Sequence, residues 1–153
     1  MTQPPRITPS SDLWRILVVA NETVASDALR DAVAARASGG ADVLVVAPAL
    51  VGRLGWLSSA DDEARERAAA RLDHCLESLR RLGVEAHGRV GDCDPLRAIE
   101  DALRTFRADE IVVATHPPGR SHWLEQGLVE RAQERVDVPL HHVVVEGAAV
   151  AAT

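Results

Sequence analysis

Lysine and tyrosine are both absent from this 153-residue sequence, and phenylalanine occurs once. All 17 basic residues are therefore arginines. Without lysine the chain cannot form a Walker phosphate loop, a lysine Schiff base or the lysine-dependent site of a phospho-receiver domain. The net charge of −6 offers no surplus of positive charge, so we expect no nucleic-acid surface.

Cysteine is also scarce, with Cys75 and Cys93 lying 18 residues apart and forming no CxxC motif. Two scattered cysteines provide neither a disulfide framework nor a metal framework, so we expect reduced thiols in a cytoplasmic protein. No apolar run reaches the roughly 18 residues that a membrane helix needs. The first twelve residues lack the apolar core of a secretory signal. We therefore expect no membrane partner.

The composition is that of a globular protein, with 46% hydrophobic and 26% charged residues. Prolines at positions 4, 5 and 9 predict a flexible arm over residues 1–12. Residues 13–146 are expected to form one domain, a length that suits a single core. The small-residue segment 147–153 is expected to be a flexible tail.

Five segments have the length and composition of strands. Three are short runs of aliphatic, largely β-branched residues, which are typical of strands buried on both faces. The other two carry more polar residues, and residues 84–90 alternate in character. The five predicted strands are residues 15–20, 42–49, 84–90, 110–115 and 138–146.

Four helices are predicted between these strands, at residues 24–37, about 60–82, 95–107 and 124–135. The first has Thr23 or Ser26 as its candidate N-cap, and the third has Asp92 or Asp94. The second carries an apolar stripe with the 3.6-residue period of a helix. The stripe consists of Ala64, Ala68, Leu72, Leu76, Leu79 and Leu82.

Strands that alternate with helices indicate crossover connections and a parallel sheet. In such a sheet, ligands bind at the carboxyl ends of the strands. Asn21, Pro48, Gly91 and the segment 115–122 follow four of the predicted strands, so these loops are expected to converge. The segments contain no GxGxxG dinucleotide motif and no GxSxG nucleophile motif.

The segment GDCDPLRAIEDALRTFRADEIVVATH, followed by GRSHWLEQGLVERAQERVDVPLHHVVV, resembles the universal stress protein family. Members have G-D-x-x-x-x-I before a helix and end in G-R-S-x-x…G-S-V-x-E-x-V…P-V-x-V-V. The resemblance covers residues 14–146 and depends on order and spacing together. It implies an α/β fold with five parallel strands in the order 3-2-1-4-5 and helices on both faces, described as Rossmann-like or adenine nucleotide alpha hydrolase-like.

The resemblance also implies a homodimer, often paired through the last strand, here residues 138–146. Strand LHHVVV would lie at a sheet edge, and apolar edges favour pairing. Many family members bind ATP through a loop G-x-x-G-x9-G-[ST], whose glycines bring backbone N–H groups close to phosphates.

This sequence departs from that loop. Ala114 or Thr115 replaces the first glycine, and two prolines precede Gly119. Seven residues rather than nine separate Gly119 from Gly127, and Leu128 replaces the hydroxyl residue. Two positions that the resemblance places near the adenine base of ATP also differ. An asparagine matches the family's aspartate after the first strand, and a proline without an N–H follows the second strand.

The candidate site for a nucleotide or another anion combines the positions that match the family loop with the polar residues around it. Arg120 is its strongest candidate for a phosphate, because arginine is the only strong cation in the sequence. The candidate residues are Asn21, Pro48, Thr115, Gly119, Arg120, Ser121 and Gly127.

No catalytic residue and no metal site is predicted. His116 and His122 flank the same loop but have no identifiable third ligand, and zinc sites usually need three or four. His141 and His142 are adjacent in a strand, so their side chains point to opposite faces and cannot chelate as a pair. Packing or interface roles are expected for them.

Three functions compete. The first is a dimeric, non-enzymatic stress-type protein with altered or lost ATP binding, and with another small ligand at the carboxyl edge of the sheet. The second is a regulator that binds ATP or AMP through a rearranged loop. The third is a small nucleotide hydrolase, although no nucleophile–base pair can be named. Fold analogy alone does not choose between them.

Overall fold

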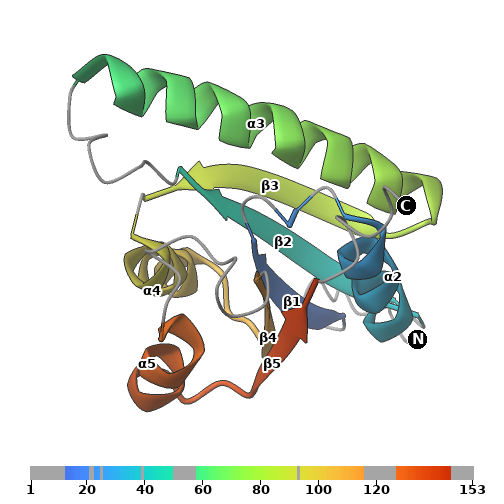
Figure 1. The fold of residues 1–153 in the computed structure, drawn as a ribbon. Coiled ribbons are helices and arrows are strands. Elements are labelled where there is room, and N and C mark those ends of the chain that lie inside the picture. The colour runs from blue at the N-terminus through green and yellow to red at the C-terminus, as the bar shows by residue number, and fades with distance from the viewer. Residues whose placement is uncertain are drawn as a thin grey trace, which may run out of the picture.

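The computed structural model describes residues 13–20, 23–24, 26–38, 40–49, 58–92, 94–115 and 127–145. The predicted flexible arm (1–12) and tail (147–153) lie outside these residues. Among the described residues no helix is both long and apolar enough to cross a membrane. Within the described ranges, five strands and four helices alternate along the chain (Figure 1).

The strands form a parallel sheet in the order β3-β2-β1-β4-β5, which confirms the predicted fold. Central strand β1 pairs with β2 from Trp14↔Ala41 to Val19↔Val46, and with β4 from Ile16↔Glu110 to Val19↔Val113. Strands β3 and β5 are the two edges. The bounds of the strands are β1 Trp14–Val19, β2 Ala41–Pro48, β3 Glu85–Gly91, β4 Glu110–Thr115 and β5 Leu140–Val144.

Two cores lie on opposite faces of the sheet, because side chains alternate along each strand. In β1, Ile16 and Val18 join the core beneath α2 and α3, whereas Leu17 and Val19 join the core beneath α4 and α5. The aliphatic runs of β1, β2 and β4 are thus buried from both sides. Edge strand β3 is different, because Ala86 is buried while its neighbours Glu85 and His87 are exposed.

Helix α2 (Asp27–Arg36) begins later than the predicted residue 24. Of the two candidate caps, Ser26 is the one used, since its side chain accepts a hydrogen bond from the Leu29 N–H. Thr23 instead donates its hydroxyl to the Ala114 carbonyl oxygen at 3.0 Å. This bond fastens the segment after β1 to the end of β4.

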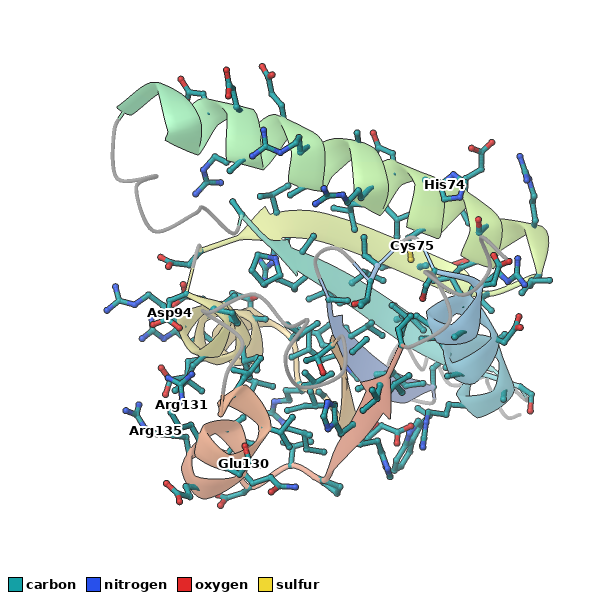
Figure 2. The ribbon with its side chains drawn as sticks, in the orientation of Figure 1. His74, Cys75, Asp94, Glu130, Arg131 and Arg135 are labelled. Atoms are coloured by element: carbon teal, nitrogen blue, oxygen red, sulfur yellow. The ribbon has the colours of Figure 1, made fainter. Side chains whose placement is uncertain are left out.

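Helix α3 (Ser58–Arg81) covers β2 and β3 through the predicted apolar stripe. Leu82 was wrongly included in that stripe, because the helix ends at Arg81 and the Leu82 side chain is 53% exposed. Cys75 points from α3 towards the sheet, whereas His74 points away from it (Figure 2). Burial raises the pKa of the Cys75 thiol to about 11.

The remaining helices, α4 (Pro95–Thr105) and α5 (Leu128–Arg135), cover the other face. Asp94 is the N-cap of α4, and its carboxylate accepts from the Leu96 N–H at 3.0 Å. The ion pair between Arg135 and Glu100, at 2.8 Å, joins α5 to α4. Helix α4 ends two residues before the predicted residue 107, and β5 begins two residues after residue 138. Residues 124–126 of the fourth predicted helix lie outside the described residues.

Candidate functional site

The carboxyl ends of the strands meet at one edge of the sheet, as the parallel topology requires. The Ala20 N–H donates to the Val46 carbonyl oxygen at 3.1 Å, and the Ala49 N–H donates to the Gly91 carbonyl oxygen at 3.2 Å. These bonds continue the sheet one residue beyond the strands. The segments that leave β1, β2 and β3 are therefore held next to one another.

Thr115 ends β4 and is 5% exposed. Its hydroxyl lies 2.8 Å from His142 Nε2, and its carbonyl oxygen accepts from the Val145 N–H at 2.8 Å. Both polar groups of this candidate residue therefore have partners on the neighbouring strand or just beyond it. His142 was not among the predicted binding residues, and its pairing with Thr115 depends on a strand register that the sequence does not reveal.

Two further candidates are described. Pro48 is buried in the last paired position of β2, opposite Gly91. Gly127 precedes α5 with a φ of 70°, a left-handed conformation that favours glycine, and no side chain caps the helix there. Its carbonyl oxygen accepts from Arg131 Nε at 3.3 Å. Asn21, Gly119, Arg120 and Ser121 lie outside the described residues.

The aspartates before α4 act on the backbone. Asp92 Oδ1 accepts from the Asp94 N–H at 2.9 Å, and Asp94 caps the helix. No group of three or more His, Cys, Asp or Glu side chains could hold a metal ion among the described residues. His116 and His122, the other candidates for such a site, lie outside them.

A cavity of about 280 Å³ lies at the carboxyl end of β3, between this strand, α4 and the start of α3. Helix α3 extends past the arrowhead of β3 and contributes Arg65 to the lining (Figure 1). Arg89 belongs to β3 and Asp101 to α4. The full lining is Val46, Arg65, Arg89, Val90, Gly91, Asp92, Ala98, Asp101 and Ala102.

The opposite end of the sheet contains a buried carboxylate. Glu110, with a side chain only 8% exposed, lies 3.1 Å from Arg36 and 2.9 Å from His141 through Oε1. Its Oε2 accepts from the Trp14 indole N–H at 3.0 Å. Trp14, the first residue of β1, is 49% exposed although it donates this bond.

A second charged cluster adjoins Glu110 at the amino end. Asp42 lies 3.5 Å from Arg15 and 3.3 Å from His87. The Arg15 guanidinium also stacks over the Phe106 ring at 4.4 Å. His87 and His141 thus contact different carboxylates at the start of the sheet. Adjacent His141 and His142 have different partners, as expected from strand geometry.

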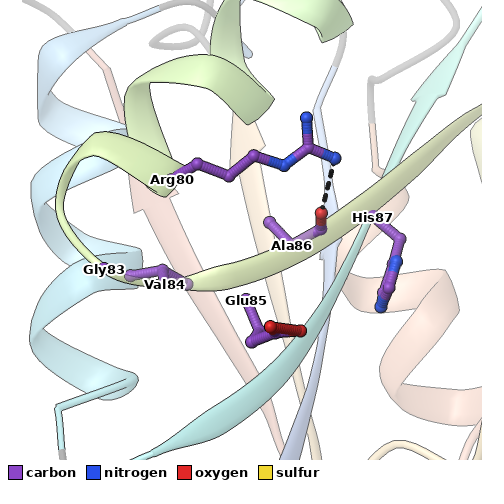
Figure 3. A pocket seen from close by; sticks show the side chains of 6 residues that line it. All are labelled: Arg80, Gly83, Val84, Glu85, Ala86 and His87. Carbon is purple, nitrogen blue, oxygen red and sulfur yellow. Dashed lines mark hydrogen bonds between the residues drawn. The ribbon is translucent and has the colours of Figure 1, made fainter.

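A larger cavity, about 450 Å³, lies at the amino end of edge strand β3 (Figure 3). Arg80 reaches across it and donates to the Ala86 carbonyl oxygen at 2.9 Å. Its lining is the helix-to-strand turn and the first residues of β3. Because ligands of open parallel sheets bind at the opposite edge, this cavity is the weaker functional candidate.

These features define a class of protein, an α/β domain built on an open parallel five-stranded sheet. No protein-family model matches the sequence, and no curated protein matches it. Solved structures do match. A protein of the universal stress protein family from Burkholderia pseudomallei has a TM-score of 0.66 and 20% identity, over 86% of this chain and 96% of that chain.

A universal stress protein from Archaeoglobus fulgidus has a TM-score of 0.59 and 24% identity, over 86% of this chain and 99% of that chain. The match includes nearly all of each of these two proteins. The chain therefore has the fold of the universal stress proteins.

Proposed function

We propose that this chain is a universal stress protein-like homodimer without enzymatic activity, in which the usual ATP site is altered or lost and another small ligand binds at the carboxyl edge. The observation that carries the proposal is Pro48 in the last paired position of β2. Proline has no N–H to offer a base at the place where the family resemblance puts the adenine. The Thr115 hydroxyl, already paired with His142, supports the same conclusion.

The alternative is a regulator that binds ATP or AMP through a rearranged loop. One observation favours it, namely that Gly127 precedes α5 and no side chain caps that helix. Uncapped N–H groups at a helix start attract anions. A hydrolase is less well supported, because the hydroxyl of the Thr115–His142 pair is buried away from an incoming substrate.

Co-purified nucleotide and the melting temperature in ATP·Mg decide between these functions. Bound ligand at 100 times its Kd would stabilise the fold by about 2.7 kcal/mol. We expect no nucleotide in the purified protein and no melting shift at millimolar ATP or AMP. A shift that Gly127→Val abolishes would instead establish the alternative, and turnover of ATP would establish the hydrolase.

The dimer is proposed to form through β5. This strand pairs with β4 on one side only, and its Val144 side chain is 40% exposed. An exposed apolar edge strand favours pairing with a second copy. The opposite edge strand, β3, differs because its exposed side chains are the polar Glu85, His87 and Arg89. In addition, Arg80 already donates a hydrogen bond to the Ala86 carbonyl oxygen of that strand.

Sedimentation equilibrium tests this dimer. We expect the wild type to be a dimer and Val144→Asp to dissociate, because the new carboxylate would be buried in the interface. Leu82→Asp is the matched control, since Leu82 is also an exposed aliphatic residue but lies beside the other edge strand. A monomeric wild type at high concentration would contradict the dimer.

We also place the protein in the cytoplasm, because of its cysteine content, and expect no nucleic-acid partner, because of its negative charge.

A further inference from the structure

We infer that the cavity between β3, α3 and α4 is the binding site for a small oxyanion that carries an apolar body, such as an aryl or alkyl phosphate or carboxylate. The inference rests on the proposed function, in which a small ligand binds at the carboxyl edge. It assigns that ligand to the β3 side of the edge, whereas the family's nucleotide loop follows β4.

The floor of the cavity is apolar. Val46, Ala98 and Ala102 are each no more than 1% exposed, and they come from β2 and α4. Gly91 allows α4 to approach this closely, because a Cβ there would lie 2.8 Å from Val46 Cγ1 and 3.0 Å from Ala98 Cβ. Small side chains on α4 therefore leave open space beside half-buried Val90, the lining residue that offers an apolar ligand group a surface to contact.

The charges around the cavity are unequally matched. Asp101 lies 3.4 Å from Arg104, whereas Asp92 accepts from the neutral Asp94 N–H and keeps an unbalanced negative charge. Arg65 has no hydrogen-bond or ion-pair partner among the described residues. Arg89 donates to the neutral hydroxyl of Thr105 at 2.9 Å.

Because Arg104 balances Asp101, the two cavity arginines face the single negative charge of Asp92, and one positive charge is left in excess. Guanidinium groups bind carboxylate and phosphate oxygens through paired N–H donors. Two of them beside the apolar surface of Val90 predict a ligand with one anionic group and one small apolar group.

The volume restricts the ligand further. About 280 Å³ is near the lower end of the range for small-molecule pockets, roughly 300–1,000 Å³. A single ring with one phosphate or carboxylate suits this space better than a nucleoside triphosphate. Phenyl phosphate and benzoate are therefore suitable probes, and comparing them identifies the preferred anion.

Calorimetric titration of the full-length protein with each probe tests the site. We expect the wild type to bind at least one probe with one-to-one stoichiometry. Arg65→Gln and Arg89→Gln should each weaken binding about tenfold, because each removes a charged hydrogen bond. Arg67→Gln is the matched control, since Arg67 lies on the same helix and pairs with Glu63 outside the cavity. Its affinity should stay within about twofold of the wild type.

Absence of binding of both probes at millimolar concentration in the wild type would overturn the inference. Equal loss in Arg65→Gln and Arg67→Gln would also overturn it, because the effect would then be general electrostatics. Binding that neither Arg65→Gln nor Arg89→Gln changes would place the ligand elsewhere, against the inference but not against the proposed function. Tight ATP binding that leaves probe binding and its dependence on Arg65 unchanged would overturn the proposed function alone.

Discussion

The two ends of the sheet differ in how their charged groups are matched. At the amino end, Glu110 has three partners and Asp42 has two. At the carboxyl end, Arg65 has no partner among the described residues, and Arg89 has only a neutral one. Charges that are already paired stabilise a fold, whereas unmatched charge beside a cavity remains available to a ligand.

This contrast indicates a division of roles. Substitutions at the amino end should lower the free energy of unfolding and leave ligand affinity unchanged. Substitutions of the cavity arginines should do the reverse. The amino end carries the larger stability effects because its carboxylate is buried among donors from β1, α2 and β5.

Glu110→Gln should have the largest effect on stability. It removes the charge from a buried carboxylate and leaves the guanidinium of Arg36 without its counter-charge, which costs about 3 kcal/mol. Urea unfolding measures the loss. Glu77→Gln is the control, because it disrupts only an exposed ion pair with Arg81 and should cost less than about 0.5 kcal/mol. Equal effects of the two substitutions would mean that the amino-end cluster contributes little.

Cys75 tests the interior of the protein rather than either end of the sheet, because its thiol should make the free energy of unfolding depend on pH. Burial raises the pKa of its thiol from 9.0 to about 11. The thiol is protonated in both states below pH 9, and above that pH the unfolded chain loses its proton first. Stability should therefore fall by about 2 kcal/mol as the pH rises from 9 to 11.

No lysine or tyrosine titrates between pH 9 and 11, because the sequence contains neither. The pH dependence of stability in this range is therefore simple to interpret. Cys75→Ala should lose the pH dependence that Cys75 contributes, while Cys93 remains in both proteins. The measurement is the free energy of unfolding in urea at several pH values. An unchanged slope in Cys75→Ala would show that the thiol is not responsible.

Gly91→Ala tests a tightly packed point at the carboxyl end of β3. The new Cβ would meet Val46 and Ala98 closer than side chains normally approach, and the expected cost is about 2 kcal/mol. Adding Val46→Ala should relieve part of the strain, so that the double variant loses less than the sum of the single variants. Thermal or urea unfolding of the three variants provides the comparison. Strict additivity would argue against the predicted contact.

Arg65→Gln should have the smallest effect on stability, less than about 0.5 kcal/mol, because the side chain is exposed and has no partner among the described residues. The same substitution is expected to weaken probe binding about tenfold. Measuring melting temperature and affinity on one preparation would establish the contrast. A large loss of stability would show that Arg65 has a structural role.

Most of the fold could be predicted from local patterns. The aliphatic runs of β1, β2 and β4 and the stripe on α3 each carry a clear period, and Ser26 and Asp94 are typical caps. Leu82 continued the period beyond the helix end, so the pattern alone misplaced it. The strand order came from the family resemblance, because periodicity does not specify which strands are neighbours.

The site was less predictable. Arg65 is one of several arginines on the polar face of an amphipathic helix, and the sequence does not distinguish it from Arg67. It becomes relevant only because α3 extends past the end of β3. In the sequence, Glu110 is likewise only a polar residue at the start of a predicted strand. Its burial depends on Trp14, Arg36 and His141, which are distant in the sequence.

Amide chemical-shift mapping with phenyl phosphate tests the division between the two ends most directly. The account predicts saturable shifts at Val90, Gly91, Ala98 and Ala102, with Glu110 and its partners unaffected. Shifts centred on the amino end, or shifts scattered over the surface without saturation, would contradict it.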